Sequence, residues 1–213
     1  SSHEVAQGYK DVKERSATAK FAVKGESNTY FLAWTTTPWT LPSNVALCVN
    51  PAETYVKIKV GDEFYILAEA LVEKNIEDEY EVIEKYVGTD LEYKEYTPLF
   101  DFAKPDKKCY YVTCDNYVTL TDGTGIVHIA PAFGEDDANV GRKYDLPFVQ
   151  LVDGKGEMTA ETPWAGTFCK DADKEVFIDL DKRGLLFNAP KFEHSYPFCW
   201  RCDTPLIYYA RDT

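Results

Sequence analysis

Short strand-like segments that do not alternate regularly with helices are the feature that most limits the folds open to this chain of 213 residues. Residues Tyr55–Val60 and Glu63–Leu67 alternate in polarity around Gly61-Asp62, which is typical of a β-hairpin. The other strands that we predict are Tyr30–Thr35, Val45–Val49, Tyr80–Val87, Val149–Val152 and, interrupted at Thr121–Gly125, the block Tyr110–Ala130. The predicted helices are Glu69–Lys74, Gly134 to about Tyr144, and Asp173–Arg183, which Gly184 ends. We therefore predict a mixed α/β fold dominated by strands, with a barrel-like β core and peripheral helices.

The length fits one large domain or two small ones, and no internal repeat or low-complexity linker divides the chain. We expect a single domain over residues 1–213. The last residues, Tyr208–Thr213, look like a strand that should continue, so an excised insertion is the simplest interpretation. No apolar run is long enough to cross a bilayer, and the polar start lacks the apolar stretch of a signal peptide, so we expect a cytoplasmic protein.

The formal net charge of −13 limits the contact with nucleic acid that this chain can make. Broad, non-specific binding to a phosphate backbone needs clustered Lys and Arg, whereas 36 acidic residues stand against 23 basic ones here. One nucleotide or a short single strand in a small pocket remains compatible with this charge. A larger RNA footprint would have to come from another part of a larger protein.

A threonine-rich segment, Trp34–Asn44, links two of the predicted strands. Pro38 and Pro42 within it lead us to expect neither a continuous ladder nor a helix. One interpretation is a strand end with turns closed by threonine hydroxyls. The other is a rigid, size-selective pocket wall that carries hydroxyl donors.

A histidine and an acidic helix start follow one another in Gly123–Asp137. Taken alone, His128 is more often a structural histidine, and Asp137 more often a partner of the helix dipole. The predicted order of strand, turn and helix can nevertheless aim both side chains at one cleft. An ionised carboxylate at that helix start would be a suitable anchor for a substrate ammonium group.

The pair Cys199-x-x-Cys202 has the spacing of half a zinc site, but no second pair occurs in the chain. The other four cysteines are scattered, and we expect them to be buried apolar residues. No Walker A loop, dinucleotide fingerprint, HExxH helix or GxSxG elbow is present. These absences disfavour nucleotide hydrolysis, hydride transfer, zinc proteolysis and serine esterase chemistry.

Four of these segments together resemble a known family. Thr35–Asn44 and Gly123–Asp137 are similar to the two editing motifs of isoleucyl-tRNA synthetases, and Tyr96–Phe100 and Tyr196–Cys202 match in the expected order. Valyl and leucyl relatives typically carry Arg where Pro38 stands, so the resemblance favours the isoleucyl branch. It covers the chain from about Tyr30 to its end and indicates the editing (connective polypeptide 1) domain of the class I aminoacyl-tRNA synthetase family.

The resemblance implies a deacylase that hydrolyses valine wrongly attached to isoleucine tRNA after transfer, with pre-transfer editing as an addition. It implies a catalytic site in which Asp137 binds the α-ammonium group while Thr37 and His128 line the side-chain pocket. It also implies substrate contacts from Thr35, Thr36, Trp39, Asn44 and Tyr196. Trp39 and Tyr196 would supply apolar wall, and the others would contact the terminal adenosine or order water.

Attack by a positioned water is the mechanism that we expect, with His128 as a general base as the alternative. The partners implied are the 3′-terminal adenosine of mischarged tRNA(Ile) and the catalytic core of a parent synthetase. From about residue 190 the chain would begin its return to that core. We expect no cofactor in this chain; zinc in the parent would use Cys199 and Cys202 with a pair from outside it.

Two features depart from the family pattern or are missing from it. Tyr93 stands where a glycine is common. The HIGH and KMSKS signatures of ATP-dependent activation are absent from this sequence, so the resemblance implies no aminoacylation by this chain. The alternatives to an editing enzyme are a non-catalytic module that binds an amino acid or nucleoside and a zinc-bearing interaction domain.

Overall fold

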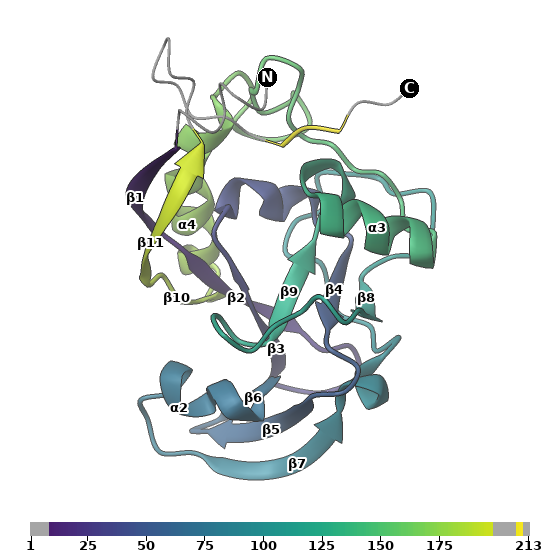
Figure 1. The fold of residues 1–213 in the computed structure, drawn as a ribbon, viewed down its shortest axis with the longest axis vertical. Helices are drawn as coiled ribbons and strands as arrows, with labels where there is room; N and C mark the ends of the chain where they lie inside the picture. The colour runs from purple at the N-terminus through teal and green to yellow at the C-terminus, as the bar shows by residue number, and fades with distance from the viewer. Residues whose placement is uncertain (1–8, 198–207, 211–213) are drawn as a thin grey trace.

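The structure is a computed structural model, and it describes residues 9–197 and 208–210; at residues 9–14 and 191–197 it describes the backbone alone. Most strands belong to one large mixed sheet that curls like half of a barrel, with helices at its periphery (Figure 1). The strands are β1 (Tyr9–Arg15), β2 (Ala17–Ala22), β3 (Thr29–Thr35), β4 (Ala46–Val49), β5 (Thr54–Val60), β6 (Glu63–Ala68), β7 (Glu81–Val87), β8 (Tyr111–Cys114), β9 (Ile126–Ile129), β10 (Leu186–Asn188) and β11 (Lys191–Pro197).

The sheet branches at β3, and this branch positions the site. One edge of β3 pairs with β2, antiparallel. The other edge serves two parallel strands in turn: Thr29 to Phe31 pair with β6, and Trp34 pairs with Val127 of β9. Because β9 also pairs with β4, it lies between β3 and β4 (Figure 1). The end of β3 is thereby brought beside the end of β9.

Within the described residues the helices are short, and the two longest are α3 (Glu135–Tyr144) and α4 (Asp173–Lys182). The others are α2 (Val72–Asn75) and the 3-10 turns η1 (Pro38–Ser43), η2 (Glu69–Leu71), η3 (Gly88–Leu91), η4 (Pro131–Phe133) and η5 (Cys169–Ala172). Three acidic residues in the first turn of α3 and two basic residues in its last turn suit the helix dipole. None of the helices in the described part of the chain is long and apolar enough to span a membrane.

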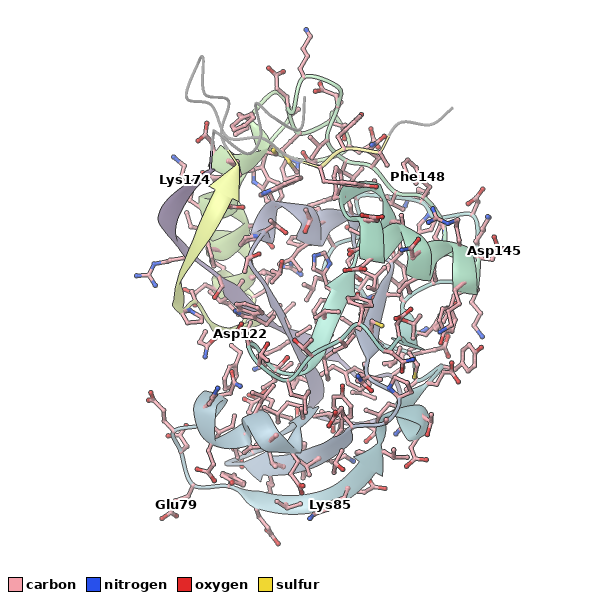
Figure 2. All side chains as sticks on the ribbon, in the orientation of Figure 1. Glu79, Lys85, Asp122, Asp145, Phe148 and Lys174 are labelled. Atoms are coloured by element: carbon pink, nitrogen blue, oxygen red, sulfur yellow. The ribbon has the colours of Figure 1, made fainter. Side chains whose placement is uncertain are left out.

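The interior holds two main apolar clusters, one on each side of β4. The larger one includes Phe21, Phe31 and Tyr55, and α4 adds Val176 and Leu180 to it. The second lies between β4, β8 and β9 and the helix α3. The charged side chains that Figure 2 labels, those of Glu79, Lys85, Asp122, Asp145 and Lys174, are exposed. The large mixed sheet curls around buried side chains and carries helices at its periphery, so the strand-dominated, barrel-like fold predicted from the sequence is confirmed.

Three sequence-based expectations need correction. The two prolines do not prevent a helix: Pro38–Ser43 forms a 3-10 turn, because Pro38 stands at its first position, where an amide proton is not needed. The strand expected at Val149–Val152 is reduced to a single bridge between Val152 and Met158. The described residues of the last segment, 208–210, are not in a strand. Within the described residues β7 and β8 do not pair, so the sheet is curled but open.

Candidate functional site

The threonine run turns sharply where β3 ends. The Thr35 hydroxyl accepts a hydrogen bond from the backbone N–H of Thr37 at 3.0 Å, which closes a turn of the kind expected from the sequence. Thr37 then precedes η1, whose first residue is Pro38. The turn and the fixed φ of proline hold the threonine side chains in place, so the segment is both a hydroxyl-closed turn and a rigid wall.

Hydroxyl groups connect this wall to β9. The Thr40 hydroxyl donates to the Thr37 carbonyl at 2.8 Å and lies 3.2 Å from the Thr37 hydroxyl. It also lies 2.8 Å from Nε2 of His128. His128 is 8% exposed, and this burial lowers the pKa of its imidazole to about 4. The ring is therefore neutral at pH 7.

Behind His128 lies a second set of polar side chains. Asn44 Nδ2 lies 3.3 Å from His128 Nδ1 and donates to the Ala46 carbonyl at 2.8 Å. The Tyr96 hydroxyl donates a short hydrogen bond to Asn44 Oδ1. Asn44 and Tyr96 are 6% and 1% exposed, so this group belongs to the protein interior. It supports the wall from the back and does not face the solvent.

Asp137 stands opposite, in the first turn of α3. Its Oδ2 accepts a hydrogen bond from the Ala130 N–H at 2.8 Å, which ties the helix to the end of β9. The carboxyl is half-buried, and burial raises its pKa to about 6, against the lowering effect of backbone hydrogen bonds. Gly134 leaves room for it, because a Cβ there would lie 2.8 Å from Asp137 Oδ1.

A cavity of about 250 Å³ lies between α3 and four threonines, which we call the threonine wall: Thr35, Thr36, Thr37 and Thr40. Five of the residues predicted from the sequence line it: Thr35, Thr36, Thr37, His128 and Asp137. Six more lining residues were not predicted: Trp34, Thr40, Tyr117, Val127, Phe133 and Asp136. The pairing of Trp34 with Val127 could not be read from the sequence, since no local signal specifies which strands are neighbours. Thr40 and Asp136 stand inside the two motifs and could have been included.

Among the described side chains, two further predicted site residues, Trp39 and Asn44, do not line this cavity. Trp39 is buried behind it, 5.3 Å ring to ring from Phe133, so it supports the wall instead of forming it. Asn44 lies behind His128, which corrects the expectation that it contacts the adenosine or orders water. Tyr196 is in β11, where its backbone pairs with Lys10, and its side chain is outside the described part. Cys199 and Cys202 also lie outside the described residues.

A second cavity of about 200 Å³ adjoins the first and shares Trp34, Tyr117 and Val127 with it. Its other lining residues come from the loop before β9 and from β9 itself, among them Asp122 and Gly125. Gly123 has φ of +71°, and a Cβ there would meet the Trp34 ring at 2.6 Å. The indole thus lies against the loop and forms a partition between two adjoining compartments.

Metal chemistry receives no support from the described residues, which contain no group of three His, Cys, Asp or Glu placed to hold an ion. The four described cysteines are free, and burial raises the pKa of the Cys48 thiol to about 12. Burial also raises the pKa of the other three thiols, so all four are protonated at pH 7. Cys48, Cys114 and Cys169 are buried as the sequence predicted, whereas Cys109 is only partly buried. Within this part of the chain the cavity offers the carboxylates of Asp136 and Asp137, a hydroxyl wall and a neutral histidine.

No protein-family model matches the chain. Isoleucine–tRNA ligase of Clostridium novyi is 58% identical over the whole chain, and that of Bacillus thuringiensis 50% identical. The chain spans 21% of the length of each of these relatives.

Solved structures show the same fold. The GlLeuRS-CP1 structure superposes with a TM-score of 0.64 at 16% identity, over 83% of this chain and 99% of that one. The editing domain of cytosolic leucyl-tRNA synthetase from P. falciparum gives 0.61 at 10% identity, over 85% of this chain and 100% of that one. The chain therefore corresponds over its full length to a segment of the isoleucine–tRNA ligases and has the fold of an aminoacyl-tRNA synthetase editing domain.

Proposed function

We propose that this chain is an editing domain that hydrolyses valine from mischarged tRNA(Ile). The observation that carries the proposal is the cavity of about 250 Å³, which has a threonine wall on one side and the half-buried Asp137 carboxylate on the other. An aminoacyl ester has a free α-ammonium group at one end and a small side chain at the other. The cavity offers a partner to each of them.

Asp137 is the proposed ammonium anchor. One of its oxygens is already held by the Ala130 N–H, so the carboxylate keeps one orientation while the other oxygen serves the ligand. A charged hydrogen bond in a site partly shielded from water is stronger than a neutral one. Burial without a cation raises the pKa of this carboxyl, and binding an ammonium group would lower it again.

The threonine wall is the proposed size filter. A synthesis site gains only about 1–3 kcal/mol from one methylene, a limit for which aminoacyl-tRNA synthetases are the standard example. A second pocket that is too small for isoleucine can remove the valine that escapes. Thr37 and His128 are held by hydrogen bonds to Thr40, so the wall resists the displacement that a larger side chain would need.

The proposed reaction is direct hydrolysis. Water attacks the ester carbonyl, the bond from that carbon to the ribose oxygen breaks, and the water proton ends on the ribose hydroxyl, leaving free valine. The Thr40 hydroxyl lies within reach of His128 but donates its proton to the Thr37 carbonyl and is not activated as a nucleophile, so the rate would come from orientation and electrostatics. The terminal adenosine would occupy the adjoining cavity beside Trp34 and Tyr117. The setting would be the cytoplasm, with the parent synthetase holding the rest of the tRNA.

Deacylation of valyl-tRNA(Ile) by the chain, alone and joined to its parent synthetase, tests the proposal. Asp137→Ala should abolish hydrolysis, whereas Glu79→Ala, an exposed acid at the opposite end of the molecule, should not change it (Figure 2). Thr37→Ala should admit isoleucyl-tRNA. The proposal fails if Asp137→Ala is as active as the wild type, and Thr37 is not part of the filter if the preference for valine over isoleucine stays unchanged. Binding of a valyl-adenosine analogue without any turnover would favour the non-catalytic module.

A further inference from the structure

Both ring nitrogens of His128 have hydrogen-bond partners inside the protein. Nε2 faces the Thr40 hydroxyl at 2.8 Å, and Nδ1 faces the Asn44 side-chain amide at 3.3 Å. A neutral imidazole carries one proton, so one nitrogen donates while the other accepts. The two partners determine which nitrogen carries the proton, and they can be analysed separately.

The Asn44 side determines Nδ1. The Ala46 carbonyl can only accept, so the Asn44 atom 2.8 Å from it must be the amide nitrogen. The Tyr96 hydroxyl, which stays protonated because burial raises its pKa, donates to the opposite atom, which must then be the oxygen. Two contacts thus fix the orientation of the amide. It presents an N–H to His128, and Nδ1 must be the accepting nitrogen.

The Thr40 side gives the same answer independently. The single hydroxyl proton of Thr40 is donated to the Thr37 carbonyl at 2.8 Å. Towards His128 the Thr40 oxygen can therefore only accept, and Nε2 must carry the proton.

We propose that Asn44, oriented by Tyr96, is a positioning residue that fixes His128 as the neutral tautomer with its proton on Nε2, so that the histidine donates to the threonine wall and does not act as the general base. The inference deepens the proposed function and rests on it for the nature of the ligand. The tautomer itself follows from the contacts described above.

The tautomer also sets the direction of the hydroxyl chain. Because Thr40 accepts from His128 and donates to the Thr37 carbonyl, its oxygen is free to accept from the Thr37 hydroxyl. Thr35, whose oxygen accepts from the Thr37 N–H, can then donate to the Thr37 oxygen at 3.3 Å. All three hydroxyl protons are directed into the wall. These three hydroxyls therefore leave oxygen lone pairs and no free proton for the cavity, which suits a water molecule that donates.

Nitrogen-15 NMR of the histidine ring measures the tautomer directly, with the His128 signals assigned by their loss in His128→Asn. Between pH 6 and pH 8 we expect a protonated Nε2 and an unprotonated Nδ1. A proton on Nδ1, an even mixture of the tautomers, or a doubly protonated ring would overturn the proposal. This result does not depend on activity, so a chain that shows the expected tautomer but no deacylation would disprove the proposed function alone.

Asn44→Asp tests the control exerted by residue 44. A carboxylate can only accept, so it should draw a proton to Nδ1 and abolish the pure Nε2–H form. If His128 keeps its proton on Nε2 alone in that variant, Asn44 does not set the tautomer.

Tyr96→Phe is the milder variant, should Asn44→Asp fail to fold. It removes the partner of Asn44 Oδ1, so we expect faster exchange of the Asn44 side-chain amide protons, a mixed tautomer, and kcat for valyl-tRNA lowered about ten-fold with little change in KM. Tyr55→Phe is the matched control, because this tyrosine is also fully buried and its hydroxyl donates to the Gly125 carbonyl, away from His128. It should leave the tautomer unchanged. A pure Nε2–H tautomer with wild-type kcat in Tyr96→Phe would remove Tyr96 from the role.

Discussion

At the scale of single residues, the properties of Asp137 link the proposed reaction to pH. Burial raises the pKa of its carboxyl to about 6, and only the ionised form can pair with an ammonium group. We therefore expect deacylation of valyl-tRNA to rise as the pH is raised through about 6 and to level off above 7. A profile of kcat/KM against pH measures this, and Asp137→Asn should be inactive throughout. A wild-type profile that is flat from pH 5 to pH 8 would contradict the role of this carboxylate.

The same pKa predicts a cost in stability. The folded pKa lies above the ordinary value of 3.8, so the folded state holds the proton more tightly than the unfolded state. The stability from this group is complete below pH 3.8 and is lost as the pH rises through about 6. The loss at pH 8 is at most about 3 kcal/mol, and screening at a half-buried site reduces it. Urea unfolding should show that Asp137→Asn is more stable than the wild type at pH 8 but not at pH 4.

Gly134 is needed for space. Its φ of −163° is open to any residue, yet an added Cβ would lie 2.8 Å from Asp137 Oδ1. Because Asp137 Oδ2 is held by Ala130, the carboxylate cannot move aside without losing a hydrogen bond. Gly134→Ala should therefore lower deacylation about ten-fold or more with the fold intact. Gly154→Ala, where an added Cβ meets no atom within 4 Å, is the matched control and should be silent. Equal activity in both variants would contradict the steric argument.

At the scale of elements, the wall is stabilised from a distant part of the chain. Asp173, the first residue of α4, accepts a hydrogen bond from the Trp39 N–H at 2.9 Å, so it caps η1 from another helix. Removing such a cap costs about 1 kcal/mol. Asp173→Ala should lower the free energy of unfolding by about that amount in urea and weaken the preference for valine over isoleucine. Asp181→Ala, an exposed acid on the same helix, should do neither.

The segment before β8 contains a strained residue. Tyr93 has φ of +69°, in the left-handed region that favours glycine, and it stands at the position where the family resemblance leads one to expect a glycine. Its ring compensates by packing 5.6 Å from the Tyr111 ring and 6.0 Å from the Tyr144 ring. Tyr93→Ala loses the ring and keeps the strain, whereas Tyr93→Gly loses both. Urea unfolding should therefore find the glycine variant about 1 kcal/mol more stable than the alanine variant. Equal stabilities would show that the backbone is not strained.

Element types were largely predictable because polarity patterns are local. The hairpin of β5 and β6, the strand β3 and the helices α3 and α4 agree with the sequence to within a residue or two. The 3-10 turn at Pro38 was wrongly excluded, since the argument against proline applies to helix interiors. Strands β1, β2, β10 and β11 were missed.

The site was predicted only in part, for a related reason. Motif residues that end up facing one another, such as Thr37 and His128, were found because each stands out in its own segment. Strand pairing across the branched sheet places Asn44 and Trp39 behind the threonine wall. It also brings Tyr117 into the lining of the cavity. That information is not contained in any short segment of the sequence.

At the scale of the whole molecule, the net charge of −13 disfavours contact between this chain and the phosphate backbone of a tRNA. A chain with this charge gains little from the phosphate backbone, so most of the recognition by this chain should come from the aminoacylated end. We expect similar kcat/KM for valyl-tRNA(Ile) and for a valyl ester of adenosine when the chain acts alone, with weak dependence on salt. A strong preference for the full tRNA that disappears in salt would indicate a backbone-binding surface on this chain.

The pairing of β1 with β11 has a consequence for any longer protein that contains this fold. The strands are antiparallel, with Tyr9 opposite Pro197 and Arg15 opposite Lys191, so the path into the fold and the path out of it are neighbours. Opposed residues in such a ladder are about 5 Å apart. A tight turn that joins Arg15 directly to Lys191 would delete the whole cavity-bearing body and keep the ribbon. In such a longer protein, β1 and β11 would be the two strands of a β-hairpin, and everything between Arg15 and Lys191 would be its loop. This loop could be gained or lost without moving the backbone on either side.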